Sequence, residues 1–306
     1  MFEVLVQMAG LILCGVGWRV FRPAGLEPVQ TRKVLTTLVY YLLLPALVLS
    51  VLWKADLGGT TLLIAASGAF ATLAGLLLSM LLCRACKSPP AVTGAVILAA
   101  GFPNVTYLGL PVLEATFGPW ARSVAIQFDL FACTPLLFTL GVMIAARYGT
   151  ADAPVHSTAA ELLRIPALWA ALAATLLNLG NVPIPSVLDG LLSLLERGVV
   201  PLMLFSLGLS LEWNPAQRRN LVSVIPVIVL RLLLVPALTV AFTGLIGLSG
   251  DWRAAVVLES AMPSMVLGIV FCDRCNLNVS LYATAVTVTT ALSLVTLPLW
   301  YRWLTG

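Results

Sequence analysis

Ten long apolar stretches, separated by short polar connections, run through the whole sequence. Each holds about 17–25 residues, which suits one α-helix across a bilayer core of roughly 30 Å. The apolar residues are continuous rather than alternating, so they do not match barrel strands of roughly ten residues. We predict membrane spans near residues 4–20, 35–53, 61–83, 91–117, 123–146, 166–182, 187–211, 221–247, 254–273 and 280–304.

Composition agrees with a chain that lives in the lipid bilayer. Of its 306 residues, 60% are hydrophobic and only 10% are charged, whereas a soluble domain carries roughly 25% charged residues. So few charges cannot cover a water-facing surface. The basic residues are spread over many loops, without the clustering that a nucleic-acid surface needs, so we expect no nucleic-acid partner.

The basic residues also predict an orientation. The odd-numbered connections hold eleven of them: Arg19, Arg22, Arg32, Lys33, Arg84, Lys87, Arg147, Arg164, Arg218, Arg219 and Arg274. The even-numbered connections and the tails hold five: Lys54, Arg122, Arg197, Arg253 and Arg302. The positive-inside rule then places the odd connections in the cytoplasm and both termini outside it.

The chain reads as two related halves, with prolines at matching places. We divide it into a first five-helix repeat (1–150), a cytoplasmic linker (151–165) and a second five-helix repeat (166–306). An odd number of crossings per repeat inverts the second copy in the membrane, and inverted repeats are typical of secondary transporters. The matched prolines are Pro45 with Pro201, Pro103 with Pro263, and Pro135 with Pro298.

The fourth and ninth spans each carry a proline near the middle, followed by a polar residue: Pro103 with Asn104, and Pro263 with Ser264. Proline cannot donate to the carbonyl four residues earlier, so we expect free carbonyls at Ala99 and Glu259. A break also starts a new helix with free N–H groups, which suit an anion. The alternative is that both prolines only kink packed helices. The predicted substrate-binding residues are Pro103, Asn104, Val105, Met262, Pro263 and Ser264.

Several motifs resemble the auxin efflux carrier family, including its short prokaryotic members. They are Tyr40-Tyr41-Leu42-Leu43-Leu44-Pro45-Ala46, Phe102-Pro103-Asn104 with Leu108-Gly109-Leu110-Pro111, Pro201-Leu202 with Leu207-Gly208, and Ala261-Met262-Pro263. The resemblance covers essentially the whole chain. It implies the all-α, bile-acid-symporter-like fold: ten transmembrane helices in two inverted five-helix repeats, with two crossed, proline-broken helices.

The resemblance further implies a scaffold domain from spans 1, 2, 6 and 7 and a mobile transport domain from the others, working by an elevator motion. Plant members place asparagine after both prolines, whereas this chain has Ser264 at the second position, which puts an auxin-like substrate in doubt. Short bacterial members are associated with malonate and other small carboxylates. We therefore expect a bacterial inner membrane location.

Ionisable residues inside a span are costly, and so they are functional candidates. Glu259 ranks first, as a ligand for a coupling cation, and it resembles a sodium-binding glutamate of the bile acid symporter branch. It could equally carry a proton, or pair with Arg231. Asn104, Gln127 and Asp129 complete the predicted cation site. Asp129 could instead line a water path, or be an interface or ion-pair residue. Glu114 and the pair Glu196 and Arg197 are expected near helix ends, where their side chains reach water.

The sequence therefore predicts a secondary transporter of a small organic anion, a mono- or dicarboxylate such as malonate, coupled to sodium or protons. An anion channel or a membrane-embedded sensor of the same fold stays open as the alternative. No catalytic constellation suggests an enzyme, and His156 is the only histidine. We expect no cofactor apart from sodium and no metal site. A homodimer is the candidate assembly.

Overall fold

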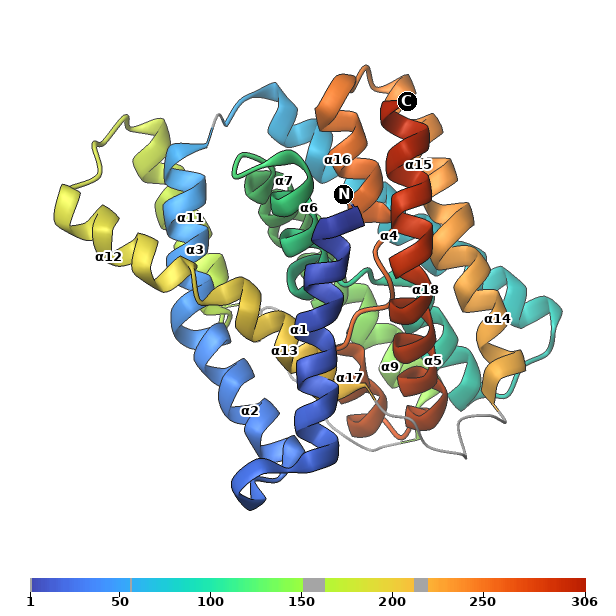
Figure 1. Ribbon diagram of the computed structural model, residues 1–306. Coiled ribbons are helices and arrows are strands. Elements are labelled where there is room, and N and C mark those ends of the chain that lie inside the picture. Colours follow the sequence, from blue (N-terminus) through green and yellow to red (C-terminus); the bar gives the residue numbers. More distant parts are fainter. Residues whose placement is uncertain (1, 56, 151–162, 212–219) are drawn as a thin grey trace.

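The computed structural model describes residues 2–55, 57–150, 163–211 and 220–306. Most of the predicted linker 151–165 lies outside these ranges, as do His156, Arg218 and Arg219. The described residues form helices joined by short connections. The marked N-terminal and C-terminal ends of the chain both lie toward the upper side of Figure 1.

Helices of the first half fall on the first five predicted spans. Span 1 is α1 (Phe2–Phe21), and span 2 runs from Pro28 to Lys54 through α2 (Pro28–Leu38) and α3 (Leu44–Lys54). Span 3 is α4 (Gly59–Ala85). Span 4 is divided into α5 (Pro90–Gly101) and α6 (Leu110–Phe117). Span 5 contains α7 (Ala121–Phe128), α8 (Thr134–Leu136) and α9 (Val142–Tyr148).

Helices of the second half fall on the other five predicted spans. Span 6 is α11 (Pro166–Leu179), and span 7 contains α12 (Ser186–Glu196) and α13 (Val199–Ser210). Span 8 contains α14 (Leu221–Val229) and α15 (Val235–Leu245). Span 9 is divided into α16 (Gly250–Ser260) and α17 (Gly268–Arg274), and span 10 is α18 (Val279–Thr305).

Six of these helical runs are long and apolar enough to cross a membrane unaided. They are Pro28–Lys54, Gly59–Ala85, Ala121–Tyr148, Ser186–Ser210, Leu221–Leu245 and Val279–Thr305. Shorter apolar helices cover Val6–Phe21, Pro90–Gly101, Val105–Phe117 and Pro166–Leu179. The structure thus supports a membrane-embedded helical protein, and span 6 is shorter than the sequence predicts.

Wide π turns precede prolines inside several spans. They are η2 (Val39–Leu43), η3 (Val105–Gly109), η4 (Asp129–Cys133) and η7 (Leu230–Leu234), and they end two residues before Pro45, Pro111, Pro135 and Pro236 respectively. A proline ring crowds the carbonyl of the preceding turn and cannot donate to it. The wider turn moves the pairing by one residue; in η2, for example, Leu44 N–H donates to the Val39 carbonyl. The helix therefore continues past the proline.

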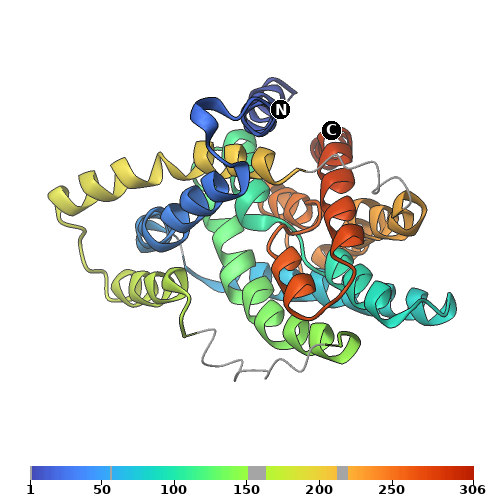
Figure 2. The ribbon, with the colours of Figure 1, turned by 90° about the horizontal axis from the view of Figure 1, so that it is seen from below.

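Two groups of helices pack mainly among themselves. In one group α1 packs against α13, α13 against α2, and both α11 and α12 against α3. Gly15 and Gly208 allow the close approach of α1 and α13, because a Cβ at either position would overlap the other backbone. In the other group α4 packs against α5, α7 and α15, and α18 packs against α14 and α16. In Figures 1 and 2, α11 and α12 lie at one edge of the molecule.

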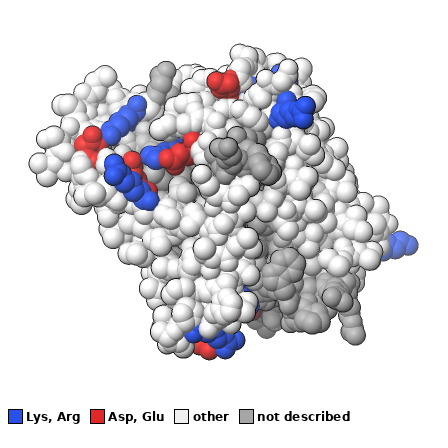
Figure 3. Space-filling view, in the orientation of Figure 1, with Lys and Arg blue, Asp and Glu red and all other residues white. Residues whose placement is uncertain are grey.

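Charged side chains avoid the middle of the visible surface. Figure 3 shows most of them gathered at the upper left and at the lower end, with a broad uncharged area between. Many leucine and valine side chains of the described helices are exposed, including Leu13, Leu62, Leu77 and Val222. A lipid-facing belt between two polar ends accounts for this distribution.

Candidate functional site

The two predicted breaks meet each other at the centre of the site. Pro103 and Ser264 face each other as an antiparallel bridge. The Asn104 N–H donates to the Pro263 carbonyl at 2.8 Å, and the Met265 N–H donates to the Phe102 carbonyl at 2.9 Å. Two interruptions about 160 positions apart in the sequence therefore satisfy each other's backbone, which buried irregular chain requires inside a membrane.

The last helix, α18, holds the second break from the other side. Thr289 accepts a hydrogen bond from the Ser264 N–H at 3.1 Å, and the Tyr282 hydroxyl donates to the Met265 carbonyl at 2.7 Å. Gly268 permits this approach, because a Cβ there would overlap the Tyr282 side chain. Seven residues, 261–267, separate α16 from α17, and these contacts fix the middle of that segment.

The first broken helix resumes directly after Asn104, whereas the second resumes four residues after Ser264. The amides of Asn104 and Ser264, which were expected to face an anion, are paired within the protein. The helices restart at Val105 and Gly268. The Glu259 carbonyl is not left free either, because it accepts from the Met262 N–H at 3.2 Å. The free amides at the first break are those of the opening turn of Val105–Phe117.

Polar side chains around the crossing are buried without a partner. Glu259 is fully buried, and neither of its carboxylate oxygens accepts a hydrogen bond from the described residues. Three further buried atoms have no hydrogen-bond partner among the described residues: Asn104 Nδ2, Gln127 Oε1 and Ser264 Oγ. Such groups are costly unless something binds them. Helix α16, which carries Glu259, packs against α7, which carries Gln127, and both pack against η3, which directly follows Asn104. The Glu259 carboxylate fills the space beside Gly109.

A cavity of about 200 Å3 opens beside this cluster. Asn104, Thr106 and Asp129 line it from the broken fourth span and from the fifth. Tyr40, Leu44, Ala167 and Met203 contribute from the group of helices that contains α2, α3, α11 and α13. The cavity therefore lies where the two helix groups meet. Both breaks take part in its lining, the first through Asn104 and the second through Met265 and Leu267.

Asp129 is the one predicted cation residue whose carboxylate oxygens both have partners. It lines the cavity, and its oxygens accept hydrogen bonds from Thr106 and from Thr134, the latter at 2.9 Å. Glu259, Asn104 and Gln127 keep unpaired atoms, whereas Asp129 is already satisfied. Two of the four predicted cation residues, Asn104 and Asp129, also line the cavity. Pro103, Val105, Met262 and Pro263 are buried in the crossing itself.

Comparison with known proteins identifies the family. A family model described as membrane transport protein matches residues 3–301. An uncharacterized transporter of Methanothermobacter thermautotrophicus is 30% identical over 302 residues, which cover 97% of this chain and 96% of the relative. The chain belongs to the auxin efflux carrier family of membrane transport proteins.

Two further relatives agree with this membership. The uncharacterized transporter YfdV of Escherichia coli is 24% identical over 207 residues, which cover 66% of this chain and 65% of the relative. A probable auxin efflux carrier component 5a of Oryza sativa is 23% identical over 232 residues, which cover 60% and 63%. The protein is thus a membrane transporter and not an enzyme.

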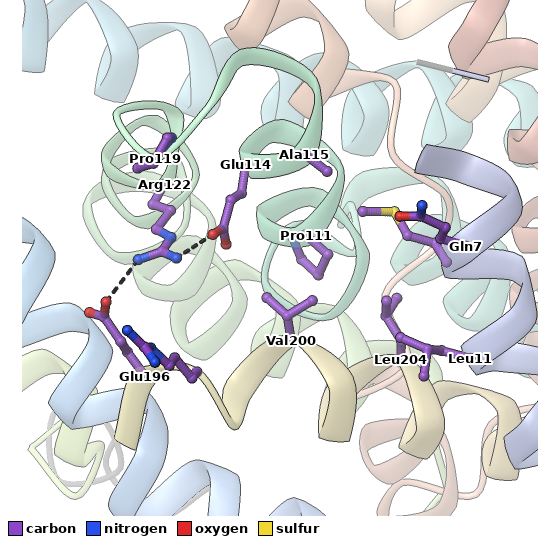
Figure 4. Close-up of a pocket in the computed structure, with 12 residues that line it drawn as sticks. Gln7, Leu11, Pro111, Glu114, Ala115, Pro119, Arg122, Glu196, Val200 and Leu204 are labelled. Atoms are coloured by element: carbon purple, nitrogen blue, oxygen red, sulfur yellow. Dashed lines mark hydrogen bonds and ion pairs between the residues drawn. The ribbon is translucent and has the colours of Figure 1, made fainter. Parts of the chain in front are cut away.

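On one side of this carrier an ion cluster joins the two helix groups. Arg122 of α7 contacts Glu114 of α6 and donates to Glu196, the last residue of α12, at 3.1 Å. Figure 4 shows the cluster at the edge of a cavity of about 470 Å3. The sequence places Glu114 and Glu196 near helix ends but does not reveal that Arg122 joins them. One basic and two acidic residues near span ends were the sequence feature that could have indicated this cluster.

Proposed function

We propose that this transporter is a secondary carrier of a small organic anion, a mono- or dicarboxylate such as malonate. One observation carries the proposal: two proline-interrupted spans meet backbone to backbone beside a cavity between two helix groups. Broken helices that meet in this way are the usual substrate site of secondary transporters. The substrate would enter the cavity of about 200 Å3 and contact the first break.

The first break offers the groups that an anion needs. Helix Val105–Phe117 begins at the cavity, and Thr106 and Tyr107 of its opening turn line it. A helix start carries roughly half a positive charge together with unpaired N–H groups. Asn104 adds the buried, unpaired donor Nδ2. A carboxylate bound there would satisfy both sets of donors.

Glu259 is the proposed coupling residue. A carboxylate that is fully buried and unpaired must take up a cation or a proton to avoid a large desolvation cost. Gln127 Oε1 lies in the same packed region and can supply a second oxygen, and oxygen ligands suit a hard cation. Sodium and protons both fit this arrangement, and the experiment below separates them.

The two helix groups fit an elevator motion. Helices α1–α3 and α11–α13 would form the fixed scaffold, and the group that carries both breaks would move with the substrate. Residues 1–150 and 166–306 would be inverted five-helix repeats joined by 151–165. In the cell we place the carrier in a bacterial inner membrane with both termini extracytoplasmic, as a homodimer.

Counterflow in proteoliposomes tests the proposal. Vesicles loaded with unlabelled malonate should accumulate labelled malonate, and other mono- and dicarboxylates should compete. A carrier shows this counterflow and saturates, whereas a channel of the same fold gives flux without counterflow. Absence of counterflow for every carboxylate tested would reject the carrier mechanism.

The coupling role has its own variant and control. Uptake by wild type should rise with a sodium gradient or with a proton gradient, and Glu259→Gln should remove that dependence. Glu27→Gln makes the same chemical change at an exposed ion pair with Arg22 and should leave the dependence intact. A Glu259→Gln carrier that still responds to the gradient would disprove the role.

A further inference from the structure

The proposed function assigns no role to Arg231, a fully buried basic side chain. Arg231 belongs to the π turn η7 of the eighth span and is the largest fully buried side chain among the described residues. Its Nη1 donates to the carbonyls of Ala100 at 3.1 Å and Gly101 at 3.3 Å. Its Nη2 donates to the carbonyl of Ser260. All three acceptors belong to the backbone.

These carbonyls are the C-terminal ends of the two helices that enter the crossing. Gly101 ends α5, and Ser260 ends α16. Each helix end leaves carbonyls unpaired and carries roughly half a negative charge. Two such ends supply about one negative charge together, which one guanidinium balances. The planar fork of arginine can reach both ends at once.

Arg231 makes no ion pair with the adjacent acid. Glu259 directly precedes Ser260, yet its carboxylate has no partner among the residues that the structure describes, and it points instead beside Gly109. The guanidinium does not line the cavity of about 200 Å3, so it is not placed to attract a substrate. Backbone carbonyls balance the charge of Arg231, and no residue among those described balances the charge of an ionised Glu259.

We propose that Arg231 is a positioning residue that clasps the C-terminal ends of α5 and α16 and thereby holds the two breaks together as one unit. The clasp keeps the bonds from Asn104 to Pro263 and from Met265 to Phe102 aligned. It also leaves Glu259 free to bind the coupling cation, and in this respect alone the inference rests on the proposed function.

Hydrogen exchange in lipid nanodiscs tests the clasp without any substrate or ion. Arg231→Met removes the charge and the donors at similar length. Exchange should rise at least tenfold in peptides covering 102–108 and 261–267. It should stay unchanged in Leu44–Lys54, the reference segment, where the Asn178 amide donates to the carbonyls of Leu52 and Trp53. Unchanged exchange at the crossing, or an equal rise in all three segments, would overturn the proposal.

If Arg231→Met does not fold, the same hydrogen-exchange measurement on Arg231→Lys tests the clasp. An ammonium group keeps the charge but cannot span both helix ends with a planar fork. We expect a smaller rise in exchange, of several-fold, confined to the crossing segments. Exchange identical to wild type in both crossing segments would overturn the clasp, because the charge alone would then suffice.

Uptake distinguishes the clasp from an ion pair with Glu259. The maximal rate of Arg231→Met should fall more than tenfold, and Arg231→Lys should recover part of the loss. Adding Glu259→Gln to Arg231→Met should recover nothing. Recovery by Glu259→Gln would show that the two charges compensate each other and would overturn the proposal. A failure of counterflow in wild type would reject the carrier function and leave the exchange result standing.

Discussion

The two breaks share a backbone plan but differ in how they are supported. The first occupies only 102–104, and its helix resumes directly as Val105–Phe117. The second extends over 261–267 and resumes as α17, which has seven residues. The first break is bonded by the second, whereas the second is also bonded by Thr289 and Tyr282 of α18. A longer irregular segment needs more partners.

Their chemistry differs at the same positions. Four residues before the proline, the first break has Ala99 and the second has Glu259. Directly after the proline, the first has Asn104 at the cavity, and the second has Ser264, which does not line it. Matched prolines thus produce similar backbone breaks with different side chains. Both breaks line the cavity, the first through Asn104 and the second through Met265 and Leu267, and only the second has a buried carboxylate four residues before its proline.

Substituting Gly268 should disturb the second break most. In Gly268→Ala the new Cβ would overlap the buried ring and hydroxyl of Tyr282, and overpacking of this kind costs about 3 kcal/mol. Reversible unfolding in mixed micelles measures the loss. Gly190→Ala is the control, since a Cβ there meets nothing within 4 Å. Equal stability of the two variants would contradict the packing described here.

Removing the Tyr282 hydroxyl should have the next largest effect. In Tyr282→Phe the Met265 carbonyl loses its donor at 2.7 Å, and an unsatisfied buried carbonyl costs about 2 kcal/mol. The same unfolding assay applies. Tyr41→Phe, at an exposed ring, should change the unfolding free energy by less than about 0.5 kcal/mol. A Tyr282→Phe protein as stable as wild type would remove α18 as a support.

Thr289→Val should cost less again, about 1 kcal/mol, because the Ser264 N–H loses a single acceptor at 3.1 Å. The loss should localise to the second break, so hydrogen exchange of 261–267 should rise while 102–108 changes less. A matched change at Thr305→Val, on an exposed helix end, should leave both segments unchanged. Equal loosening of both breaks would show that α18 supports them jointly.

Among these variants, Gly109→Ala should change the unfolding free energy least and the cation dependence of uptake most. The three atoms nearest to the new Cβ all belong to the flexible end of Glu259, and alanine recovers about 0.5–1 kcal/mol of helix stability relative to glycine. The unfolding free energy should therefore stay within about 1 kcal/mol of wild type. The carboxylate must move, so uptake should lose its cation dependence. Retained dependence would show that the space beside Gly109 is not the coupling site.

Hydropathy and proline spacing predicted the membrane helices and both breaks, because these depend on local sequence. They did not predict the π turns that end two residues before Pro45, Pro111, Pro135 and Pro236. Nor could they show that the amides of Asn104 and Ser264 are paired, since that depends on two distant segments meeting.

The same limit applies to the arginines. Arg231 could be recognised as an intramembrane charge, but its carbonyl partners at Ala100 and Ser260 come from two other spans. Arg122 lies close in sequence to Glu114, yet its bond to Glu196 joins different helix groups. Such roles follow from the three-dimensional meeting of helix ends, which periodicity does not contain.

Thermal unfolding of the purified carrier with carboxylates tests the central claim most directly. A ligand present at 100 times its dissociation constant stabilises the folded state by about 2.7 kcal/mol. At least one mono- or dicarboxylate should raise the melting temperature of wild type, more strongly with sodium or at lower pH. Asn104→Ala should lose the whole shift, and Glu259→Gln should lose only its cation dependence. A full shift in Asn104→Ala would contradict substrate binding at the crossed breaks.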